Sequence, residues 1–434
     1  MSKRIVVFGS GFVAGPVVEF LSRREENQIT VASNILAEAN RLATKYPRVS
    51  CVEVDVTNES QISELVAEHD IAISLVPYVF HTLIAGVCIK FKKHLVTASY
   101  VSKEMRELDQ QAREANVLIL NEIGLDPGID HLSAMKVIDD AHAKGAKVKS
   151  FASWCGGLPA PECNDNPLGY KFAWAPRGVL MALLNEAQYL KAGDVVTVNS
   201  NALMKSAKPV TLSEELDLEG YPNRDSVPYR EAYGIPECDN LIRGTLRYKG
   251  FSEILDDAHL LGLLKVDSKP DEKITWAEWF EEAEKEVGGI SSKSKQALEW
   301  LGLIDPNSKL PVVDSMLDAF CTMLQAKLQY ENDQFDMIAL QHRFEIVHND
   351  KSEYLSSTLV VKGDPKGFSA MSKTVGYPVG IATQMILDGD ISDTGVKIPV
   401  EQHIYEPILE GLKAENIECI EQPMNALNEN FFIG

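Results

Sequence analysis

The sequence has few basic residues, no long apolar run and no cysteine pair in the CxxC spacing of zinc or redox motifs. Its 7 cysteines are scattered and odd in number, which favours reduced thiols. The apolar segment after Lys3 and Arg4 is too short and too rich in glycine for a signal peptide or a membrane span. Since 42 Lys and Arg stand against 63 Asp and Glu, the net charge of −21 repels nucleic acid and anionic lipid. We therefore expect a cytoplasmic protein that binds neither nucleic acid nor a membrane.

Length and texture predict more than one domain. A chain of 434 residues exceeds the usual size of a single hydrophobic core. Residues 1–124 alternate helical stretches with short Val, Ile and Leu-rich strands, namely RIVVFG, ITVAS, SCVEVDV, IAISLVP, KHLVTAS and VLILNE. This rhythm predicts an α/β fold with a doubly wound parallel sheet, the Rossmann architecture. The C-terminal segment of about 375–434 begins with small residues at helical spacing, and we expect it to return to this domain.

The middle of the chain has a different pattern. Loops rich in Gly, Pro and Asn separate strands, and residues 343–361 alternate on both sides of an Asn-Asp turn, as a hairpin does. We predict a second, α+β substrate domain formed by 125–251 and 336–374. Residues 252–335 are acid-rich with helical periodicity and predict a helical insertion, whose expected core comprises Trp276, Trp279, Phe280 and Trp300.

Residues 9–14, GSGFVA, form the pattern G-x-G-x-x-A between the first strand and the first helix. Gly9 can make the tight turn, Gly11 lets the backbone approach a pyrophosphate, and Ala14 allows close contact between helix and sheet. Ser10, Phe12 and Val13 complete this turn. The strand-turn-helix context predicts a dinucleotide site. The alternative is a glycine turn that holds no ligand.

The second strand ends in VASN, with Ser33 and Asn34 where an NAD site commonly has an acid. A carboxylate would repel a 2′-phosphate, whereas hydroxyl and amide groups tolerate it, so the sequence favours NADP over NAD. The arginine expected beside a 2′-phosphate is missing at this point, and Arg41 is an uncertain substitute. Asp55 either meets the adenine amino group or caps the next helix. Further cofactor contacts are expected at the other strand ends, from Val56, Val76, Ser99, Leu125 and Asp126.

Several longer motifs carry a family resemblance. They are GSGFVA, SLVPYVFH, VTASYVS, NEIGLDPGIDHLSAMKVID, SWCGGLPAPECNDNPLGYKFAW, YPNRDS, RGTLRYKGF and TVGYPVGIAT. In this order they closely resemble the saccharopine reductases, the NADP-dependent, glutamate-forming saccharopine dehydrogenases of fungal lysine biosynthesis. The resemblance covers nearly the whole chain and is less clear in the acidic helical segment and the last few dozen residues. It implies that glutamate condenses with 2-aminoadipate 6-semialdehyde and that NADPH reduces the imine to saccharopine. It also implies a homodimer.

The resemblance gives roles to individual residues. Asp126 is the expected catalytic carboxylate, orienting or stabilising a cationic imine; its alternative role is a turn or helix cap, for which Asp130 is better placed. Arg224 and Arg247 are the expected carboxylate clamps, because a guanidinium can bind a carboxylate at two points. The remaining expected substrate contacts are Ser99, Tyr100, Cys155, Gly156, Trp174, Thr245 and Leu246.

Other interpretations stay open. His81 and His131 have no second His or Cys at ligand spacing, so we expect no metal site. Carboxynorspermidine dehydrogenases and homospermidine synthases also act on imines, but their amine-rich substrates call for acidic pockets rather than Arg224 and Arg247. A noncatalytic NADP-binding regulator with the same fold is the alternative from another class; it would bind cofactor without turnover.

Overall fold

The chain folds as two compact units. The computed structural model describes residues 2–173, 176–213 and 215–424. The first unit comprises Met1–Lys144 and Gly367–Ile420, and the second comprises Gly145–Lys366 and Glu421–Gly434. Within the described residues, no helix is both long enough and apolar enough to cross a membrane.

The division differs from the expected boundary at residue 124. Helix α7 (Ile129–Ala143) stays with the first unit because it packs against α16 (Gln402–Ala414), where the Tyr405 hydroxyl donates to Asp139 at 2.6 Å. At the other end, β16 (Ile420–Pro423) joins the sheet of the second unit. Of the segment 375–434, which we expected in the first domain, helices α15 and α16 lie in the first unit and β16 lies in the sheet of the second, while residues 425–434 lie outside the described residues.

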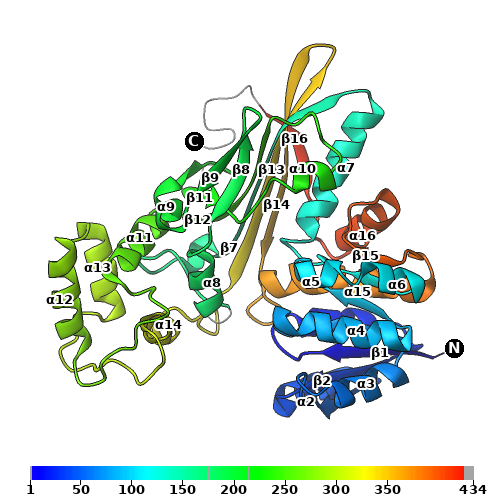
Figure 1. Ribbon diagram of the computed structural model, residues 1–434, viewed down its shortest axis with the longest axis horizontal. Helices are drawn as coiled ribbons and strands as arrows, with labels where there is room; N and C mark the ends of the chain where they lie inside the picture. The colour runs from blue at the N-terminus through cyan, green and yellow to red at the C-terminus, as the bar shows by residue number, and fades with distance from the viewer. Residues whose placement is uncertain (1, 174–175, 214, 425–434) are drawn as a thin grey trace. The chain divides into compact units, whose positions relative to one another are not determined.

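A seven-stranded parallel sheet forms the first unit (Figure 1). Its order is β15-β6-β5-β4-β1-β2-β3. The strands are β1 (Lys3–Phe8), β2 (Asn27–Ser33), β3 (Val49–Glu53), β4 (Ile71–Ser74), β5 (His94–Thr97), β6 (Leu118–Leu120) and β15 (Gly395–Lys397). The six predicted strands are thus confirmed. Since the order reverses between β1 and β4, ligands are expected outside the carboxyl ends of these strands.

Helices lie on both faces of this sheet and bury its apolar side chains. They are α1 (Ala14–Ser22), α2 (Leu36–Lys45), α3 (Glu59–Glu68), α4 (His81–Phe91), α5 (Lys103–Arg106), α6 (Asp109–Glu114) and α15 (Ala370–Asp388), besides α7 and α16. Helix α15 packs along α1 and brings a late segment of the chain to the first helix. The contact is close because glycines face it: a Cβ at Gly376 would lie 2.8 Å from Pro16, and one at Gly380 would lie 3.0 Å from Phe20.

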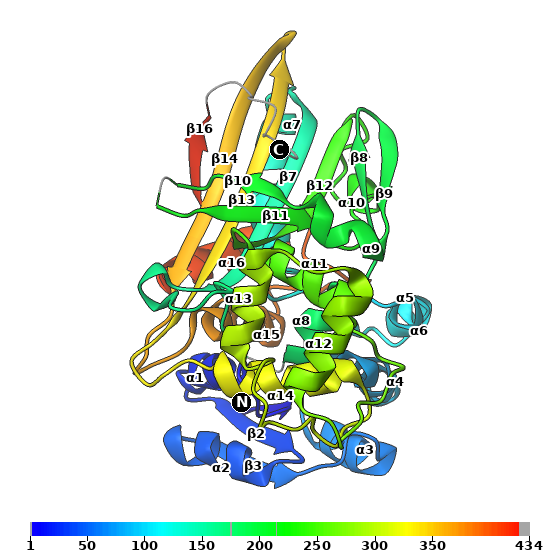
Figure 2. The same cartoon turned by 90° about the vertical axis from the view of Figure 1, so that its left-hand side faces the viewer.

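The second unit is built on a mixed sheet of nine strands, best seen in Figure 2. Its main path is β10-β11-β12-β7-β13-β14-β16, and β8 and β9 extend from β12. The strands are β7 (Lys147–Pro159), β8 (Ala187–Lys191), β9 (Asp194–Val198), β10 (Lys208–Val210), β11 (Leu218–Pro222), β12 (Asn240–Tyr248), β13 (Asp336–His348) and β14 (Lys351–Lys362). The predicted hairpin is confirmed as β13 and β14. Its turn residues Asn349 and Asp350 have φ of 49° and 60°, as a two-residue hairpin turn requires.

The segment 252–335, which we predicted to be helical, contains four helices: α11 (Phe251–Leu261, which begins one residue earlier), α12 (Trp276–Val287), α13 (Ser292–Leu301) and α14 (Met316–Lys327). Thr275 caps α12 in a capping box with Glu278, as the Thr-x-x-Glu spacing indicates. Trp276 and Phe280 are buried in the core of these helices, and Trp279 packs against it. The expectation that Trp300 belongs to this core was wrong, because the residue is 40% exposed. The shorter helices of this unit are α8 (Pro176–Ala182), α9 (Ser200–Leu203) and α10 (Tyr229–Ala232).

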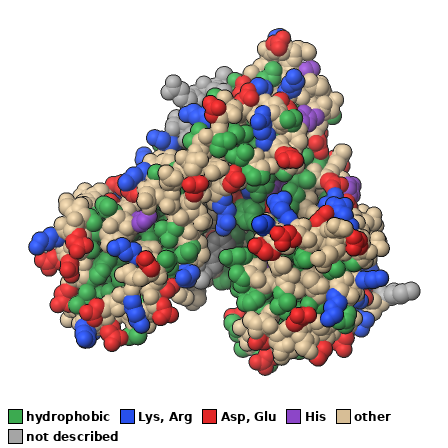
Figure 3. Space-filling model, in the orientation of Figure 1, with side chains coloured by type: hydrophobic (Ala, Val, Ile, Leu, Met, Phe, Trp, Pro, Cys, Tyr) green, Lys and Arg blue, Asp and Glu red, His purple; other side chains and the backbone are tan. Residues whose placement is uncertain are grey.

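Charge is distributed widely over the surface. On the face drawn in Figure 3, acidic and basic side chains are interspersed over both units. Many carboxylates are paired locally, for example Glu284 with Lys295 at 2.8 Å and Asp109 with Arg113 at 2.8 Å.

Candidate functional site

The glycine turn has the geometry that a pyrophosphate needs. Gly9 has φ of 107°, and a Cβ there would lie 3.1 Å from the backbone of Leu75, so this position requires glycine. Gly11 is exposed, and a Cβ on it would meet no atom within 4 Å, which leaves open space beside its backbone. Helix α1 begins at the buried Ala14, so its first-turn amides face the same turn. These residues fit a dinucleotide.

The end of β2 lies against this turn. The Ser10 hydroxyl donates to Ser33 Oγ at 2.8 Å, and Ser33 Oγ also accepts the Ile35 N–H at 3.0 Å. Ser10 Oγ additionally lies 3.3 Å from Oε2 of Glu38, a residue that the sequence analysis did not consider. Asn34 is exposed beside them. Ser10 and Ser33 are therefore brought together at the strand end where we expect the ribose.

The neighbouring strand ends hold the other expected cofactor residues. Asp55 follows β3 and accepts two hydrogen bonds from Thr57, which lower the pKa of its carboxyl group. The helix-cap alternative for Asp55 was wrong, because Asn58 caps α3 through the amides of Ser60 and Gln61. Half-buried Val56 and Val76 both pack on the hydrophobic cluster under this edge of the sheet.

A buried histidine connects two of these strand ends. His81 Nδ1 lies 2.7 Å from the Ser74 hydroxyl at the end of β4, and its Nε2 lies 2.8 Å from the Ser99 hydroxyl beyond β5. The imidazole is 4% exposed, and burial lowers its pKa to about 4. It is therefore neutral near pH 7 and holds Ser99 in place by hydrogen bonding alone.

Asp126 and Tyr100 meet at the end of β6. The Tyr100 hydroxyl donates to Asp126 Oδ1 at 3.0 Å, and both side chains are half-buried. Beside Asp126, Leu125 is buried. Asp130, which we expected to cap the following helix, does not occupy its N-cap position, which is Gly128. The Asp130 carboxylate lies in the first turn of α7 and accepts the Gly128 N–H at 2.6 Å.

The buried carboxylate of Glu122 connects the segment after β5 to helix α7. Glu122 Oε1 accepts the Val101 N–H at 3.0 Å, and its Oε2 lies 2.7 Å from His131 Nε2. Glu122 and His131 are 3% and 0% exposed. Glu122 thus ties the segment carrying Ser99 and Tyr100 to helix α7, which follows Asp126.

In the second unit, four expected substrate residues lie together on β7 and β12. Cys155 pairs with Thr245 in the parallel register, and a Cβ on Gly156 would lie 2.7 Å from the carbonyl of Leu246. Gly156 is thus required for the close approach of the two strands. The Leu246 side chain is fully buried in a hydrophobic cluster with Trp154, so it does not present itself to a ligand.

Arg247 occupies an aromatic setting. Its guanidinium carbon lies 4.9 Å from the ring centre of Tyr170 and 5.3 Å from that of Phe251, and Nη1 donates to the Leu246 carbonyl at 2.7 Å. The residue is 8% exposed. Arg224 lies just after β11; it is exposed and has φ of 54°. Trp174, the remaining expected substrate contact, lies outside the described residues.

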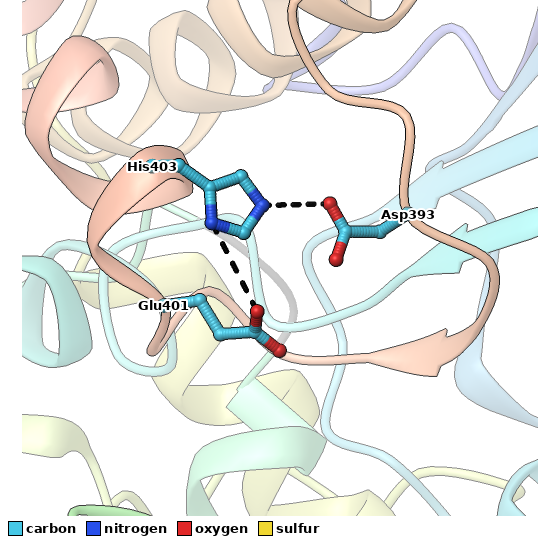
Figure 4. A group of neighbouring side chains, drawn as sticks. All are labelled: Asp393, Glu401 and His403. Carbon is cyan, nitrogen blue, oxygen red and sulfur yellow. Dashed lines mark hydrogen bonds and ion pairs between the residues drawn. The ribbon is translucent and has the colours of Figure 1, made fainter.

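One group of side chains has the composition of a metal site (Figure 4). His403 lies 2.7 Å from Asp393 and 3.9 Å from Glu401. The ammonium of Lys397 also pairs with Glu401 and lies 3.9 Å from Asp393. Since a cation of the protein itself already balances these carboxylates, we do not assign a metal to them.

Two family models together match most of the chain. The saccharopine dehydrogenase NADP binding domain matches residues 5–120, and the saccharopine dehydrogenase C-terminal domain matches residues 124–417. The chain belongs to the saccharopine dehydrogenase family. In this chain, the match to the NADP binding domain covers the whole glycine turn and the ends of β2, β4 and β5. The match to the C-terminal domain covers β7 and β12.

Individual relatives are similar over almost the full length of this chain. Saccharopine dehydrogenase [NADP(+), L-glutamate-forming] of Pyricularia oryzae is 42% identical over 97% of this chain and 99% of its own. The protein of that name from Saccharomyces cerevisiae is 43% identical over 95% and 97%. Mitochondrial alpha-aminoadipic semialdehyde synthase of Bos taurus is 43% identical over 96% of this chain, which spans 47% of that protein.

A solved structure of the family agrees with the fold. Apo histidine-tagged saccharopine dehydrogenase (L-Glu forming) from Saccharomyces cerevisiae superposes with a TM-score of 0.90 at 40% identity, over 98% of this chain and 100% of that one. The Rossmann-like first unit and the mixed second sheet are therefore those of the saccharopine dehydrogenases.

Four polar residues of the site escaped the sequence analysis or were left without a role. Glu38 lies four residues after Asn34, the last residue of the VASN motif. In the sequence it looks like an ordinary acidic residue in the first turn of a helix, where it would stabilise the helix dipole. Glu122 and His131 are separated by nine positions, and only the fold shows that they meet. His81 was considered as a metal ligand, whereas its partners are two serine hydroxyls.

Proposed function

We propose that the chain catalyses the NADP-dependent, glutamate-forming saccharopine dehydrogenase reaction. Glutamate condenses with 2-aminoadipate 6-semialdehyde, and reduction of the imine gives saccharopine, the penultimate step of lysine biosynthesis by the aminoadipate pathway. The reaction is reversible. The observation that carries the proposal is the 42% identity to an enzyme of this name over 97% of this chain and 99% of that enzyme.

NADPH, when bound, supplies the hydride. The residues that would hold it are those of the glycine turn with Ser33, because Gly9 and Gly11 leave room for a pyrophosphate and Ser10 joins the turn to the ribose end. Ser99, fixed by His81, and Tyr100 would line the reacting end, since both follow β5 at the carboxyl edge of the sheet.

The Asp126 carboxylate would favour the protonated imine. Tyr100 donates to one of its oxygens, which fixes its orientation. A carboxylate held in a half-buried position stabilises a nearby cation more strongly than one in water. Hydride transfer to an iminium carbon needs no proton from the protein, so orientation and charge are the roles that we give to Asp126.

Arg224 and Arg247 would bind the carboxylates of the substrate. Arg247 is stacked on Tyr170 and Phe251, which fixes the plane of its guanidinium before a substrate arrives. Thr245 and Cys155 lie side by side on β12 and β7 and would line the same pocket. These cations also distinguish the proposal from carboxynorspermidine dehydrogenases and homospermidine synthases, whose substrates carry more amines.

The direct test follows NADPH absorbance. Oxidation is expected when glutamate and 2-aminoadipate semialdehyde are supplied together and not with either alone, and saccharopine with NADP should reverse it. Turnover without glutamate would contradict the imine reaction. Binding of NADPH with no turnover under any of these conditions would instead support the noncatalytic regulator.

Arginine variants test the clamp. We expect Arg247→Ala to raise KM for saccharopine roughly 10- to 100-fold, as loss of a charged hydrogen bond does. Arg224→Ala should raise it in the same direction. The control is Arg113→Ala, because Arg113 pairs with Asp109 on the surface of the first unit. Unchanged KM in both clamp variants would remove these arginines from the site.

We further propose that the protein is a cytoplasmic homodimer. Each of its 7 cysteines is a free thiol, which supports a reducing compartment. The dimer is proposed on family resemblance. Sedimentation equilibrium at micromolar concentration should give twice the chain mass of 48.0 kDa, and a mass of 48.0 kDa itself would contradict it.

A further inference from the structure

A cavity opens at the amino ends of the first three strands of the first unit. Its volume is about 330 Å³, at the lower end of the range for small-molecule sites. The expected dinucleotide lies at the carboxyl ends of these parallel strands, so the cavity is at the opposite edge of the sheet. We call it the amino-edge pocket; it is lined by Arg4, Gln28, Ile29, Thr30, Arg48, Val49, Ser50 and His69.

The register of the strands turns four polar side chains of this pocket to one face of the sheet. Arg4 of β1 pairs with Gln28 of β2, and Thr30 of β2 pairs with Ser50 of β3. Paired residues, and residues two apart on one strand, project from the same face. Thr30 is half-buried and the other three are exposed. This face of the sheet is therefore polar at its amino end and open to solvent.

Two arginines give the pocket a positive charge. Within the described residues, neither the Arg4 nor the Arg48 side chain pairs with a carboxylate, whereas Arg23 and Arg24 do. Arg48 Nη2 donates to the carbonyls of Ser22 at 2.8 Å and Arg24 at 3.3 Å. These bonds fix the Arg48 guanidinium and use only one of its three nitrogens. Both arginines can therefore donate to an anion.

His69 borders the pocket without adding charge. Its Nδ1 lies 2.6 Å from the Leu65 carbonyl, which can only accept, so Nδ1 carries the proton and Nε2 accepts the Thr30 hydroxyl at 2.8 Å. Burial lowers the pKa of this imidazole, which is neutral near pH 7. The neighbouring Asp70 accepts the Arg4 N–H at 2.7 Å through Oδ2. No carboxylate is among the described residues that line the pocket.

We infer that the amino-edge pocket binds a small oxyanion with at least two negative charges, either a phosphate ester or a polycarboxylate. A guanidinium presents two parallel N–H groups that match both kinds of group. Arg4 and Arg48 supply one guanidinium each, and the Gln28 amide and the Ser50 hydroxyl can donate to the remaining oxygens. The inference does not depend on the proposed function, because the pocket lies away from the residues assigned to it.

A purely structural role for these arginines has different consequences. Arg48 bonds carbonyls at the end of α1, so its loss would lower the free energy of unfolding whether or not an anion binds. Arg4 is exposed and its guanidinium makes no such contact with the described residues. Anion affinity in Arg4 variants therefore separates binding from support of the fold.

The test measures binding of pyrophosphate and of citrate by isothermal titration calorimetry at constant ionic strength, with NADPH saturating the dinucleotide site. We expect saturable binding of at least one probe at millimolar concentration. Pyrophosphate alone would identify a phosphate ester as the ligand class, and citrate alone would identify a polycarboxylate.

Variants locate the bound probe. Arg4→Gln and Arg48→Gln should each weaken it about tenfold. Ser50→Asp places a carboxylate in the pocket and should reduce binding below detection. The control is Arg106→Gln, which removes an exposed arginine of α5 that does not line the pocket and should leave the affinity within about twofold.

Equal affinity in Arg4→Gln and the unaltered chain would overturn this inference, as would the absence of saturable binding for both probes. Loss of binding in Arg247→Ala but not in Arg4→Gln would place the anion at the proposed substrate clamp and overturn it too. Should Arg48→Gln not fold, the exposed Arg4 and Ser50 still test the pocket. If NADPH itself did not bind, the proposed function would fail, and the same variants would test the pocket without it.

Discussion

A single neutral imidazole joins two strands at the carboxyl edge of the first sheet. His81 lies between Ser74 at the end of β4 and Ser99 after β5; His81 and Ser74 are buried, and Ser99 is half-buried. A charged imidazole would lose more solvation here than two hydroxyl groups restore, which is why burial lowers its pKa. Protonation would therefore disturb the position of Ser99 at the proposed site.

This arrangement predicts acid sensitivity. The pKa of His81 is about 4 when folded against 6.5 ordinarily, so between these values the unfolded chain binds a proton that the folded chain refuses. The free energy of unfolding must then fall with falling pH, by about 2 kcal/mol from pH 7 to pH 5. Urea titrations should show a fall smaller by this amount in His81→Asn. Equal falls in the two proteins would contradict the assignment.

Single residues also show how far the sequence alone could predict the site. Ser99 and Asp126 lie at strand ends, as their place after apolar runs indicated, and the glycine turn could be read from its spacing. The contacts of His81 and Glu122 could not be predicted, because burial and pairing depend on segments that are distant in the chain. Trp300 was misjudged for the same reason: helical spacing does not tell which turn of a helix meets solvent.

Helices α1 and α15 approach each other through glycine. At Gly376 a Cβ would lie 2.8 Å from both Pro16 and the carbonyl of Val13, the N-cap residue of α1. Neither neighbour can move without shifting α1 itself. The contact thus couples a helix from the end of the chain to the turn that is proposed to hold the dinucleotide.

The same substitution should therefore have opposite effects in two helices. Gly376→Ala is expected to lower the free energy of unfolding by about 1 to 3 kcal/mol through overpacking. Gly86→Ala in α4, where a Cβ meets nothing within 4 Å, should raise it by about 0.5 to 1 kcal/mol. Thermal or urea unfolding measures both. An increase in the free energy of unfolding of Gly376→Ala would contradict the prediction, because it would show that the contact between α1 and α15 has room for a methyl group.

The individual helices and strands were the features most readily predicted from the sequence. The six strands of residues 1–124 and the hairpin follow from apolar runs, alternation and turn residues, and α12 follows from its capping box. Their partners were harder to predict. Strand β15 adds to the first sheet next to β6 although it is only three residues long, and no periodic pattern of such length distinguishes a strand from a loop.

At the scale of the whole molecule, the first unit consists of two distant parts of the chain. Its second part supplies α15, α16 and β15, none of which carries an expected cofactor residue. These elements nevertheless cover α1 and α7 and extend the sheet beyond β6. Stability of the dinucleotide site is therefore a property of the complete first unit rather than of residues 1–144.

Removal of the late segment tests this dependence. A chain that ends at residue 366 should lose NADPH binding, measured by fluorescence titration, although every residue of the glycine turn remains. The matched control ends at residue 424 and retains α15, α16 and β16, so its affinity should stay within about twofold of the full chain. Native affinity in the shorter chain would contradict the dependence.

The two units alternate along the chain, and this order has a consequence for synthesis on the ribosome. After residue 144 the ribosome adds the 222 residues from 145 to 366 (366 − 145 + 1) before the first unit resumes. At roughly 5 to 20 residues per second this takes roughly 10 to 45 seconds. During that interval the sheet of the first unit still lacks its edge strand β15 and the helices α15 and α16. At that point the second unit lacks only residues 421–434, which include most of its edge strand β16, whereas the first unit lacks α15, α16 and β15.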